Sequence, residues 1–245
     1  MQRRSESTSF KSCKQFNNMV DPAIAGSRKS IGRSVAQRYF SGDALQDKLA
    51  RALARELALP IKELVESCEF FACVRQRVRA RVVADLCCGH GLVGILFALF
   101  ERQVEEVVLI DREQPDNFAK VLDSAVRVGP WVGDKVVYRE APLKNVPGLL
   151  EPGTSIVATH ACGALTDHCL DCAVQVGGAV AVMPCCYPRR ICPAPQALQR
   201  QFGMEQAFDI HRTYRLEEAG YYVRWTSVPE VITPMHRVLI GTPRR

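Results

Sequence analysis

Residues 81–94 read RVVADLCCGHGLVG, a short apolar run that ends in an acid and continues into a glycine-rich turn. Residues 82–86 are apolar apart from Asp85, which suits a strand buried on both faces of a parallel sheet. The apolar residues 92–100 are long enough to form the helix that leaves the turn. Because glycine has no side chain, the turn lets the backbone approach a ligand closely. The stretch therefore predicts a strand, a turn and a helix that together bind a nucleotide.

Two classes of nucleotide cofactor fit this turn. Residues 89–94 match the G-x-G-x-x-G pattern of dinucleotide-binding folds, and Asp111 lies 20 residues beyond Gly91, as those folds require. Asp85, however, lies four residues before Gly89. In nicotinamide-binding folds the strand at this position usually contains only apolar residues up to the first glycine. This acid favours the other class of cofactor.

The segment DLCCGHG, which begins at Asp85, resembles the D-L-G-C-G-x-G motif of class I S-adenosylmethionine (SAM)-dependent methyltransferases. Cys87 stands where those enzymes usually carry glycine, which predicts a tighter turn or a differently aimed backbone. The resemblance implies that Asp85 serves the methionine end of the cofactor and that Asp111 holds the ribose hydroxyls. The residues predicted to bind SAM are Asp85, Cys87, Gly89, Gly91, Asp111, Arg112, Glu140, Ala141 and Thr159.

Two further motifs follow the first one along the chain: residues 159–167 (THACGALTD) and residues 183–187 (MPCCY). They resemble a branch of class I methyltransferases with H-x-C-G-x-x-T-D and P-C-C motifs, and the resemblance covers about residues 80–243. The branch includes the tRNA ribose 2′-O-methyltransferases and methyltransferase-like proteins of unsettled substrate. The substrate stays open here, because Thr159 replaces a lysine of the tRNA enzymes and the sequence lacks their zinc knuckles. The sequence also lacks the D-P-P-Y or N-P-P-Y motif of exocyclic-amine methyltransferases.

Three side chains are the predicted catalytic residues: His160, Asp167 and Tyr187. Methyl transfer is an in-line displacement at an activated sulfonium, so the enzyme has to align the acceptor and dispose of a proton. With an ordinary pKa of about 6.5, His160 could take that proton from a hydroxyl or a ring nitrogen near neutral pH. Two other roles stay open. His160 could be a hydrogen-bonded residue that orients its loop, and Asp167 could complement the dipole of the helix that it opens.

Cysteines and histidines follow three of the predicted strands. They are Cys87, Cys88, His90, His160, Cys162, Cys185 and Cys186. Zinc requires four ligands in a tetrahedron, whereas adjacent residues at a strand end tend to point to opposite faces of the sheet. We therefore expect no metal site and expect these cysteines to line the floor of a tight pocket. Cys169 and Cys172 form a single C-x-x-C inside a predicted helix and are expected to pack in the core.

The remaining chain alternates between strands and helices. Further strands are predicted at residues 104–111, 135–140, 155–160 and 179–185, and further helices at residues 116–128, 166–176 and 196–219. Residues 221–228 and 236–240 predict a hairpin. The pattern predicts an α/β, Rossmann-like, doubly wound seven-stranded sheet, mostly parallel, with a C-terminal antiparallel hairpin. The methyltransferase resemblance implies the same fold, whereas a nicotinamide-binding domain would need a second half and a substrate domain.

The first 40 residues hold the excess positive charge. They contain eight Lys or Arg against two acids, which gives +6, equal to the net charge of the whole chain. We predict that residues 1–40 form a disordered basic arm, with an RNA-gripping arm or an organelle transit segment as alternatives. Residues 41–79 are predicted to form a helical preface and residues 80–245 the SAM-binding methyltransferase domain.

The preface is predicted to contain two helices. Ser41 is predicted to cap the first, whose leucines recur every four residues, and Pro60 to end it. The second begins at Pro60 and keeps a helical apolar spacing as far as Phe71. Core packing against the sheet and a lid over the substrate are both open interpretations.

Length and composition exclude other classes of protein. Of the 245 residues 47% are apolar, enough for one large core, and no apolar run reaches the ~18 residues of a membrane span. Eleven cysteines in a chain of this length, without an apolar secretory segment, predict reduced thiols and a cytoplasmic location.

We therefore predict a SAM-dependent methyltransferase whose acceptor is RNA, with the tRNA ribose 2′-hydroxyl as one candidate. The alternatives are a protein or small-molecule acceptor, a non-catalytic cofactor-binding or metal-binding accessory protein, and a nicotinamide oxidoreductase. No membrane partner is expected, and the oligomeric state stays open.

Overall fold

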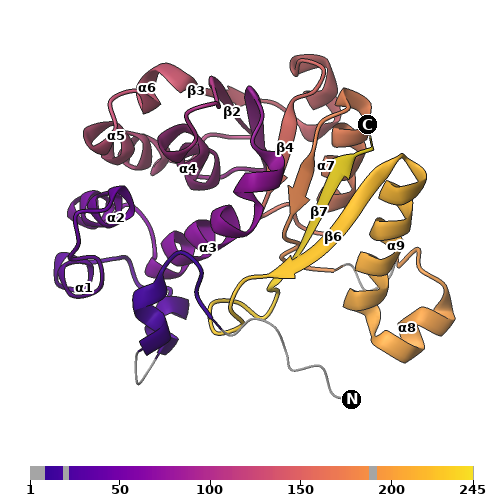
Figure 1. The fold of residues 1–245 in the computed structure, drawn as a ribbon, viewed down its shortest axis with the longest axis horizontal. Helices are drawn as coiled ribbons and strands as arrows, with labels where there is room; N and C mark the ends of the chain where they lie inside the picture. The colour runs from indigo at the N-terminus through magenta and orange to yellow at the C-terminus, as the bar shows by residue number, and fades with distance from the viewer. Residues whose placement is uncertain (1–8, 19–21, 188–191, 245) are drawn as a thin grey trace.

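The computed structural model describes residues 9–18, 22–187 and 192–244, and its centre is one seven-stranded sheet (Figure 1). The strands are β1 (Val82–Leu86), β2 (Glu106–Asp111), β3 (Val136–Glu140), β4 (Ser155–Ala158), β5 (Val180–Val182), β6 (Tyr221–Ser227) and β7 (Arg237–Pro243). Their order across the sheet is β3-β2-β1-β4-β5-β7-β6. Strands β1 to β5 are parallel, whereas β7 runs antiparallel to both β5 and β6. The predicted α/β fold with its C-terminal antiparallel hairpin is confirmed.

Helices cover both faces of the sheet (Figure 1). The α-helices are α1 (Arg33–Tyr39), α2 (Leu45–Glu56), α3 (Ile61–Val78), α4 (Leu92–Phe100), α5 (Phe118–Val128), α6 (Val132–Lys135), α7 (Ala164–Val176), α8 (Gln196–Phe202) and α9 (Met204–Glu218). Short 3₁₀ helices are η1 (Lys14–Asn18), η2 (Pro22–Gly26) and η3 (Leu143–Leu149). Side chains of a strand alternate between the two faces. In β1, Val83 accordingly belongs to the buried cluster that contains residues of α3, α4 and α5, whereas Ala84 and Leu86 belong to the cluster that contains residues of α7.

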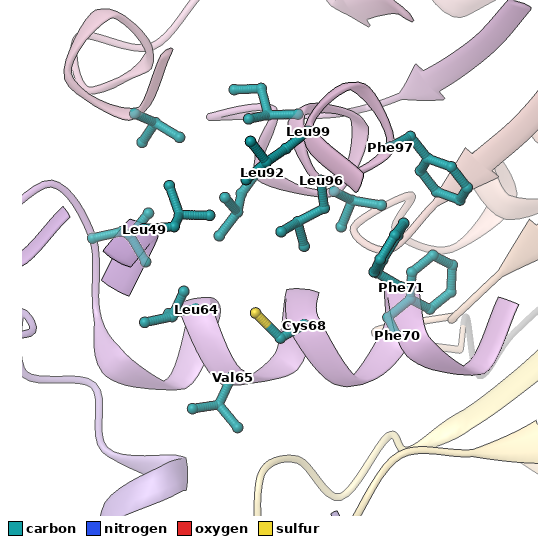
Figure 2. Close-up of a cluster of buried hydrophobic side chains, with 14 of the residues drawn as sticks. Leu49, Leu64, Val65, Cys68, Phe70, Phe71, Leu92, Leu96, Phe97 and Leu99 are labelled. Atoms are coloured by element: carbon teal, nitrogen blue, oxygen red, sulfur yellow. The ribbon is translucent and has the colours of Figure 1, made fainter. Parts of the chain in front are cut away.

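Helices α3 and α4 pack together over one face of the sheet (Figure 2). Leu64, Cys68 and Phe71 recur at helical spacing along α3 and are all buried. The Phe71 ring meets the Phe97 ring of α4 edge-on, with ring centroids 4.9 Å apart. Burial of an apolar side chain of this size stabilises the fold by ~1.5–3 kcal/mol. The apolar side of α3 is therefore part of the core.

The ends of the preface helices differ in part from the prediction. Helix α2 begins at Leu45, and its N-cap residue is Ala44, whose side chain makes no capping hydrogen bond. Ser41 is exposed and lies three residues before Ala44. The predicted Ser41 cap is therefore wrong, because buried residues such as Leu49 and Leu53, and not a cap, hold this helix in place. Helix α2 ends at Glu56, before Pro60, and Pro60 directly precedes α3 as predicted.

Much of the N-terminal segment is folded against the domain. Phe10, Cys13 and Phe16 are buried, and the backbone N–H groups of residues 11–13 all donate to the carboxylate of Glu69 in α3, at 2.7 to 2.9 Å. The predicted disorder is therefore wrong for residues 9–18 and 22–40, whereas residues 1–8 and 19–21 lie outside the described residues. The apolar residues of this segment are spaced irregularly between basic ones. The overall composition of the segment is therefore that of a disordered basic arm, although some of its apolar side chains are buried.

The predicted helix over residues 196–219 is interrupted by Gly203. This glycine has φ +78° and ψ 164° and separates α8 from α9, since such a backbone cannot continue a helix. Across the described part of the chain, no helix combines the length and the apolar character that crossing a membrane requires.

Candidate active site

Predicted site residues lie together at one edge of the sheet. Asp85, Asp111 and Glu140 lie at the carboxyl ends of β1, β2 and β3, and Thr159 and His160 follow β4. Because these strands are parallel, their carboxyl ends meet at the same edge. Strand β1 lies between β2 and β4, so the strand order reverses here. Open α/β sheets bind their ligands outside such a reversal point.

The glycine turn between β1 and α4 combines tight packing with an open face. A Cβ at Gly91 (φ +72°) would lie 2.5 Å from Leu109 Cδ1, and one at Gly94 would lie 2.9 Å from Val107 Cγ1. These two glycines therefore let α4 pack closely on β2. Gly89 (φ +52°) differs, because no heavy atom lies within 4 Å of its Cβ position. The turn is thus open at Gly89, where a ligand has room to approach.

Cys87 takes the backbone conformation that favours glycine. Its φ is +52°, in the left-handed region, which costs a residue with a side chain about 1–2 kcal/mol. The thiol of Cys169 in α7 donates a hydrogen bond to Cys87 and lowers the pKa of the Cys87 thiol. The sequence predicted that cysteine at this position would tighten the turn or change the direction of its backbone. Instead, Cys87 adopts the backbone conformation that glycine would take, and the contact with Cys169 in α7 holds it there.

Asp85 is a buried carboxylate with one oxygen unpaired. Its Oδ2 accepts the backbone N–H of Gly94 at 2.9 Å, whereas its Oδ1 is buried and has no hydrogen-bond partner within the described residues. Burial raises the pKa of Asp85 from its ordinary 3.8 to about 7. An unpaired buried oxygen is costly, so this position fits a cationic hydrogen-bond donor from a ligand.

Asp111 is held in place by the backbone around it. Its Oδ2 accepts the N–H of Gly89 at 2.8 Å, and its Oδ1 accepts the N–H of Arg112 at 2.7 Å. Its carbonyl accepts the N–H of Ala141 at 2.8 Å. Each carboxylate oxygen keeps a lone pair beyond the one used here. The carboxylate is thus fixed beside the glycine turn and can still accept from a ligand.

The other predicted cofactor residues lie around this centre. Glu140, next to Asp111 in the sheet, accepts the N–H of Gln114 through Oε1 at 2.9 Å. Arg112 is exposed, and Thr159 is buried at the end of β4. These residues border the same edge of the sheet without a contact that singles out a ligand.

Helix α3 contributes an acid that the sequence did not single out. Glu63 Oε2 lies 3.0 Å from Nε2 of His90 in the glycine turn, and Nδ1 of His90 accepts the N–H of Leu92 at 3.2 Å. The ring proton of neutral His90 therefore lies on Nε2. The hydrogen bond from His90 lowers the pKa of Glu63. Besides its core side, α3 thus has a polar side that faces the turn.

His160 is largely enclosed, and its ring is free of hydrogen bonds to other described residues. Burial lowers the pKa of His160, and the charges of Glu66 and Glu63 on α3 oppose this effect. The imidazole is therefore neutral at pH 7 and able to accept a proton. The signal for Glu63 and Glu66 was in the sequence: they are acids three residues apart in the first half of a helix with an apolar periodicity.

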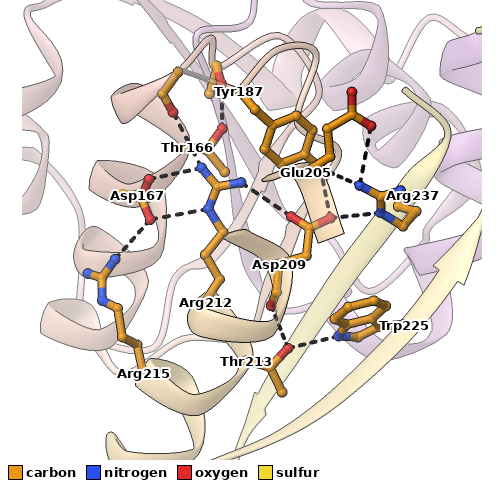
Figure 3. A network of polar contacts seen from close by, with 12 residues as sticks. Thr166, Asp167, Tyr187, Glu205, Asp209, Arg212, Thr213, Arg215, Trp225 and Arg237 are labelled. Carbon is orange, nitrogen blue, oxygen red and sulfur yellow. Dashed lines mark hydrogen bonds and ion pairs between the residues drawn. The ribbon is translucent and has the colours of Figure 1, made fainter. Parts of the chain in front are cut away.

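Asp167 and Tyr187 belong to a buried ion network around Arg212 (Figure 3). Arg212 is fully buried and pairs with Asp167 at 2.9 Å and with Asp209 at 3.3 Å. Tyr187 donates its hydroxyl to Asp209 at 2.7 Å, and Arg237 of β7 pairs with Asp209 at 2.8 Å. The network links the segments after β4 and β5 to α9 and β7.

This network changes the interpretation of both predicted catalytic residues. Asp167 also pairs with Arg215 at 2.8 Å, so both of its oxygens are engaged by guanidinium groups. Burial raises the pKa of Tyr187, whose hydroxyl proton is already donated to Asp209. These contacts tie both side chains to α9, and their predicted catalytic roles stay predictions. Arg212 and Asp209, which complete the network, were missed because a fully buried arginine in a helix has no sequence signature.

Three cysteines come together at the ends of β4 and β5. The Sγ atoms of Cys162, Cys185 and Cys186 lie within 4.8 Å of one another. The expectation that adjacent cysteines point to opposite faces is wrong here, because β5 ends at Val182 and the Cys185–Cys186 pair lies beyond it, at a bend. By contrast, the C-x-x-C cysteines of α7 are buried in the core as expected.

Comparison with known proteins shows similarity to other proteins, of which three are described here. A glutathione S-transferase C-terminal domain-containing protein of Xenopus laevis is 25% identical over 196 residues, which cover 66% of this chain and 31% of that protein. This chain thus spans about a third of that relative. A SAM-dependent methyltransferase from Aquifex aeolicus has 16% identity and a TM-score of 0.46, over 76% of this chain and 95% of that one. The fibrillarin pre-rRNA processing protein of Methanococcus jannaschii has 12% identity and a TM-score of 0.46, over 67% of each chain.

The fold and the site together define a class I SAM-dependent methyltransferase domain, and SAM is its cofactor. Residues 56–189, more than half of the chain, match the family described as "Methyltransferase domain", and the chain belongs to this family.

Proposed function

We propose that this chain transfers the methyl group of SAM to RNA, with His160 as the base that takes the proton of the acceptor. One observation carries the proposal. A neutral imidazole without a partner among the described residues lies at the same sheet edge as the glycine turn, Asp85 and Asp111. SAM, when bound, supplies an activated methyl group, so the protein has to position the acceptor and remove one proton.

The residues at this edge fit the cofactor. The unpaired Oδ1 of Asp85 suits the ammonium group of the methionine part, since a charged donor would satisfy it. The two oxygens of Asp111 suit the ribose hydroxyls, and the open face at Gly89 leaves space for the cofactor. We assign Arg112, Glu140, Ala141 and Thr159 to the border of the same site.

His160 has the properties of a general base. Burial lowers its pKa, so the ring is neutral before the reaction. The nearby carboxylates of Glu63 and Glu66 stabilise the imidazolium that forms when the proton arrives. A hydroxyl or a ring nitrogen of the acceptor would lose its proton to this ring. Tyr187 and Asp167 hold the surrounding segments in place.

The RNA acceptor is supported by the two motifs at residues 159–167 and 183–187. Beside the second motif lies a pocket of about 500 Å³, lined among others by the exposed ring of Phe202 and by Arg237. A nucleobase fits this volume, and aromatic rings and guanidinium groups are surfaces on which unstacked RNA bases stack. We place the reaction in the cytoplasm, because all eleven cysteines are free thiols, as in a reducing compartment.

The decisive experiment is transfer of a labelled methyl group from SAM into fractionated RNA, protein and metabolites. Label in RNA with the wild-type chain, and its loss in a folded His160→Asn variant, is the expected result. Label in the protein or metabolite fraction would overturn the assignment of RNA as the acceptor. Absence of label in all fractions, from a chain that binds S-adenosylhomocysteine, would overturn the proposal that the chain is catalytic.

A further inference from the structure

The cysteine cluster after β4 and β5 is separate from the cofactor residues. Cys162 lies two residues beyond His160, and Cys185 and Cys186 precede Tyr187. Their three Sγ atoms lie within 4.8 Å of one another, although the two segments are more than 20 residues apart in the sequence. Cys162 is exposed and Cys185 is partly buried, so an ion from solvent can reach the cluster.

The spacing of the sulfurs suits a thiolate-bound metal ion. Tetrahedral zinc has Zn–S distances of about 2.3 Å, which place two of its sulfur ligands about 3.8 Å apart. The three Sγ atoms therefore need to approach one another by about 1 Å at most, and both segments lie outside the strands. Soft thiolate ligands select zinc over magnesium or calcium.

The thiols hydrogen-bond to one another without a metal. Burial raises the pKa of both Cys162 and Cys185, and the Cys162 thiol also interacts with Cys185 and Cys186. Zinc binds thiolates, so binding of one Zn²⁺ to the three thiols releases their three protons to solvent. Three thiolates leave the fourth position of the tetrahedron for another ligand. Cys186 also lines the 500 Å³ pocket, so water or a group in that pocket has access to the cluster.

We propose that Cys162, Cys185 and Cys186 bind one zinc ion through three thiolates, with the fourth position open to water or to a ligand from the pocket. The ion ties the segment that carries His160 to the segment that carries Tyr187. This site does not depend on methyl transfer, because its ligands lie outside the cofactor residues.

The test uses the full chain, freshly reduced, freed of metal by a chelator and kept without oxygen. Titration with Co²⁺ gives a thiolate-to-cobalt charge-transfer band whose intensity follows the number of thiolates, together with visible bands typical of tetrahedral cobalt. Zn²⁺ then displaces the cobalt. We expect one ion per chain and a charge-transfer band of three thiolates. Each of Cys162→Ser, Cys185→Ser and Cys186→Ser should weaken zinc binding at least tenfold.

Cys192→Ser is the matched control, because this partly buried cysteine follows Cys186 by six residues in the sequence and is not one of the three clustered cysteines. It should bind zinc as the wild type does. If the serine variants do not fold, alkylation of wild-type thiols with and without Zn²⁺, mapped by mass spectrometry, decides instead. Protection of the three cluster cysteines alone supports the site. Equal alkylation with and without zinc, a stoichiometry below one, or equal loss in Cys192→Ser overturns it.

Discussion

At the scale of single residues, Asp85 couples the stability of the fold to pH in the neutral range. Its folded pKa of about 7 is higher than the ordinary 3.8, so the folded state binds this proton more tightly than the unfolded chain. Its contribution to stability is therefore complete below about pH 4 and is lost as the pH rises to about 7. A carboxylate that destabilises the fold without its ligand is typical of a binding site.

Asp85→Asn should remove this dependence, because asparagine has a similar shape and does not ionise. Between pH 5 and pH 8, the free energy of unfolding of the cofactor-free wild type should fall by about 2–3 kcal/mol relative to the variant. Urea denaturation at both pH values measures the difference. The variant should also bind S-adenosylhomocysteine roughly ten- to hundredfold more weakly, because a charge-assisted hydrogen bond is lost. A stability difference that is the same at both pH values would contradict this account.

His160→Asn tests the base. Asparagine keeps a hydrogen-bonding group but cannot take a proton, so single-turnover methyl transfer should fall by ~10² to 10⁴ while S-adenosylhomocysteine affinity stays near wild type. Because burial lowers the pKa of His160, the wild-type rate should decline only below about pH 6.5, and the variant should lack this limb. Single-turnover rates of the wild type and the variant, measured from pH 5 to pH 9, test both expectations. Substantial activity with an unchanged pH profile would assign His160 to loop orientation.

At the scale of elements, α3 has three functions. Its apolar side packs on α4, Glu63 contacts His90 in the glycine turn, and Glu69 accepts the backbone N–H groups of residues 11–13. The apolar periodicity of the sequence predicted the first function alone. The others depend on which distant segments pack against the helix, and a periodic pattern does not contain that information.

Glu69→Gln should destabilise the fold through the N-terminal segment. The amide has one oxygen in place of two and brings an NH₂ group toward backbone donors, so buried N–H groups lose their acceptor. A buried donor without a partner costs ~1–3 kcal/mol. We therefore expect a loss of about 2–4 kcal/mol in urea denaturation. Glu105→Gln, at an exposed carboxylate, is the control and should change stability by less than about 1 kcal/mol. Equal effects of the two substitutions would contradict the role of Glu69.

At the scale of the whole molecule, the N-terminal segment belongs to the fold. Deletion of residues 1–18 removes the buried side chains of Phe10, Cys13 and Phe16 and the partners of Glu69, so the free energy of unfolding should fall by several kcal/mol. Deletion of residues 1–8, which keeps Phe10, Cys13, Phe16 and the partners of Glu69, is the control and should cost less stability than deletion of residues 1–18. Thermal and urea denaturation of both shortened chains give the comparison. Equal stability of the two shortened chains would support the original prediction of a disordered N-terminal arm.

The sequence predicted the sheet well because parallel strands are nearly continuous apolar runs closed by turns, as in residues 82–86. It also predicted that Asp85, Asp111 and His160 lie at one edge of the sheet, because parallel strands bring their carboxyl ends together. It could not predict the left-handed Cys87, the Arg212 network or the converging sulfurs. Each of these depends on loop geometry or on a partner far away in the sequence.

The place of β7 has a consequence for synthesis of the chain. Of the seven strands of this sheet β7 is synthesised last, yet it lies inside the sheet, between β5 and β6, and Arg237 at its start joins the Arg212 network. On the ribosome, β1 to β5 emerge first with the free edge of β5 exposed, and β6 cannot join the sheet until β7 has emerged. The sheet and the network that holds the acceptor side of the site should therefore be completed together, after translation of residues 237–243, and a nascent chain stalled before them should depend on a chaperone to protect that edge.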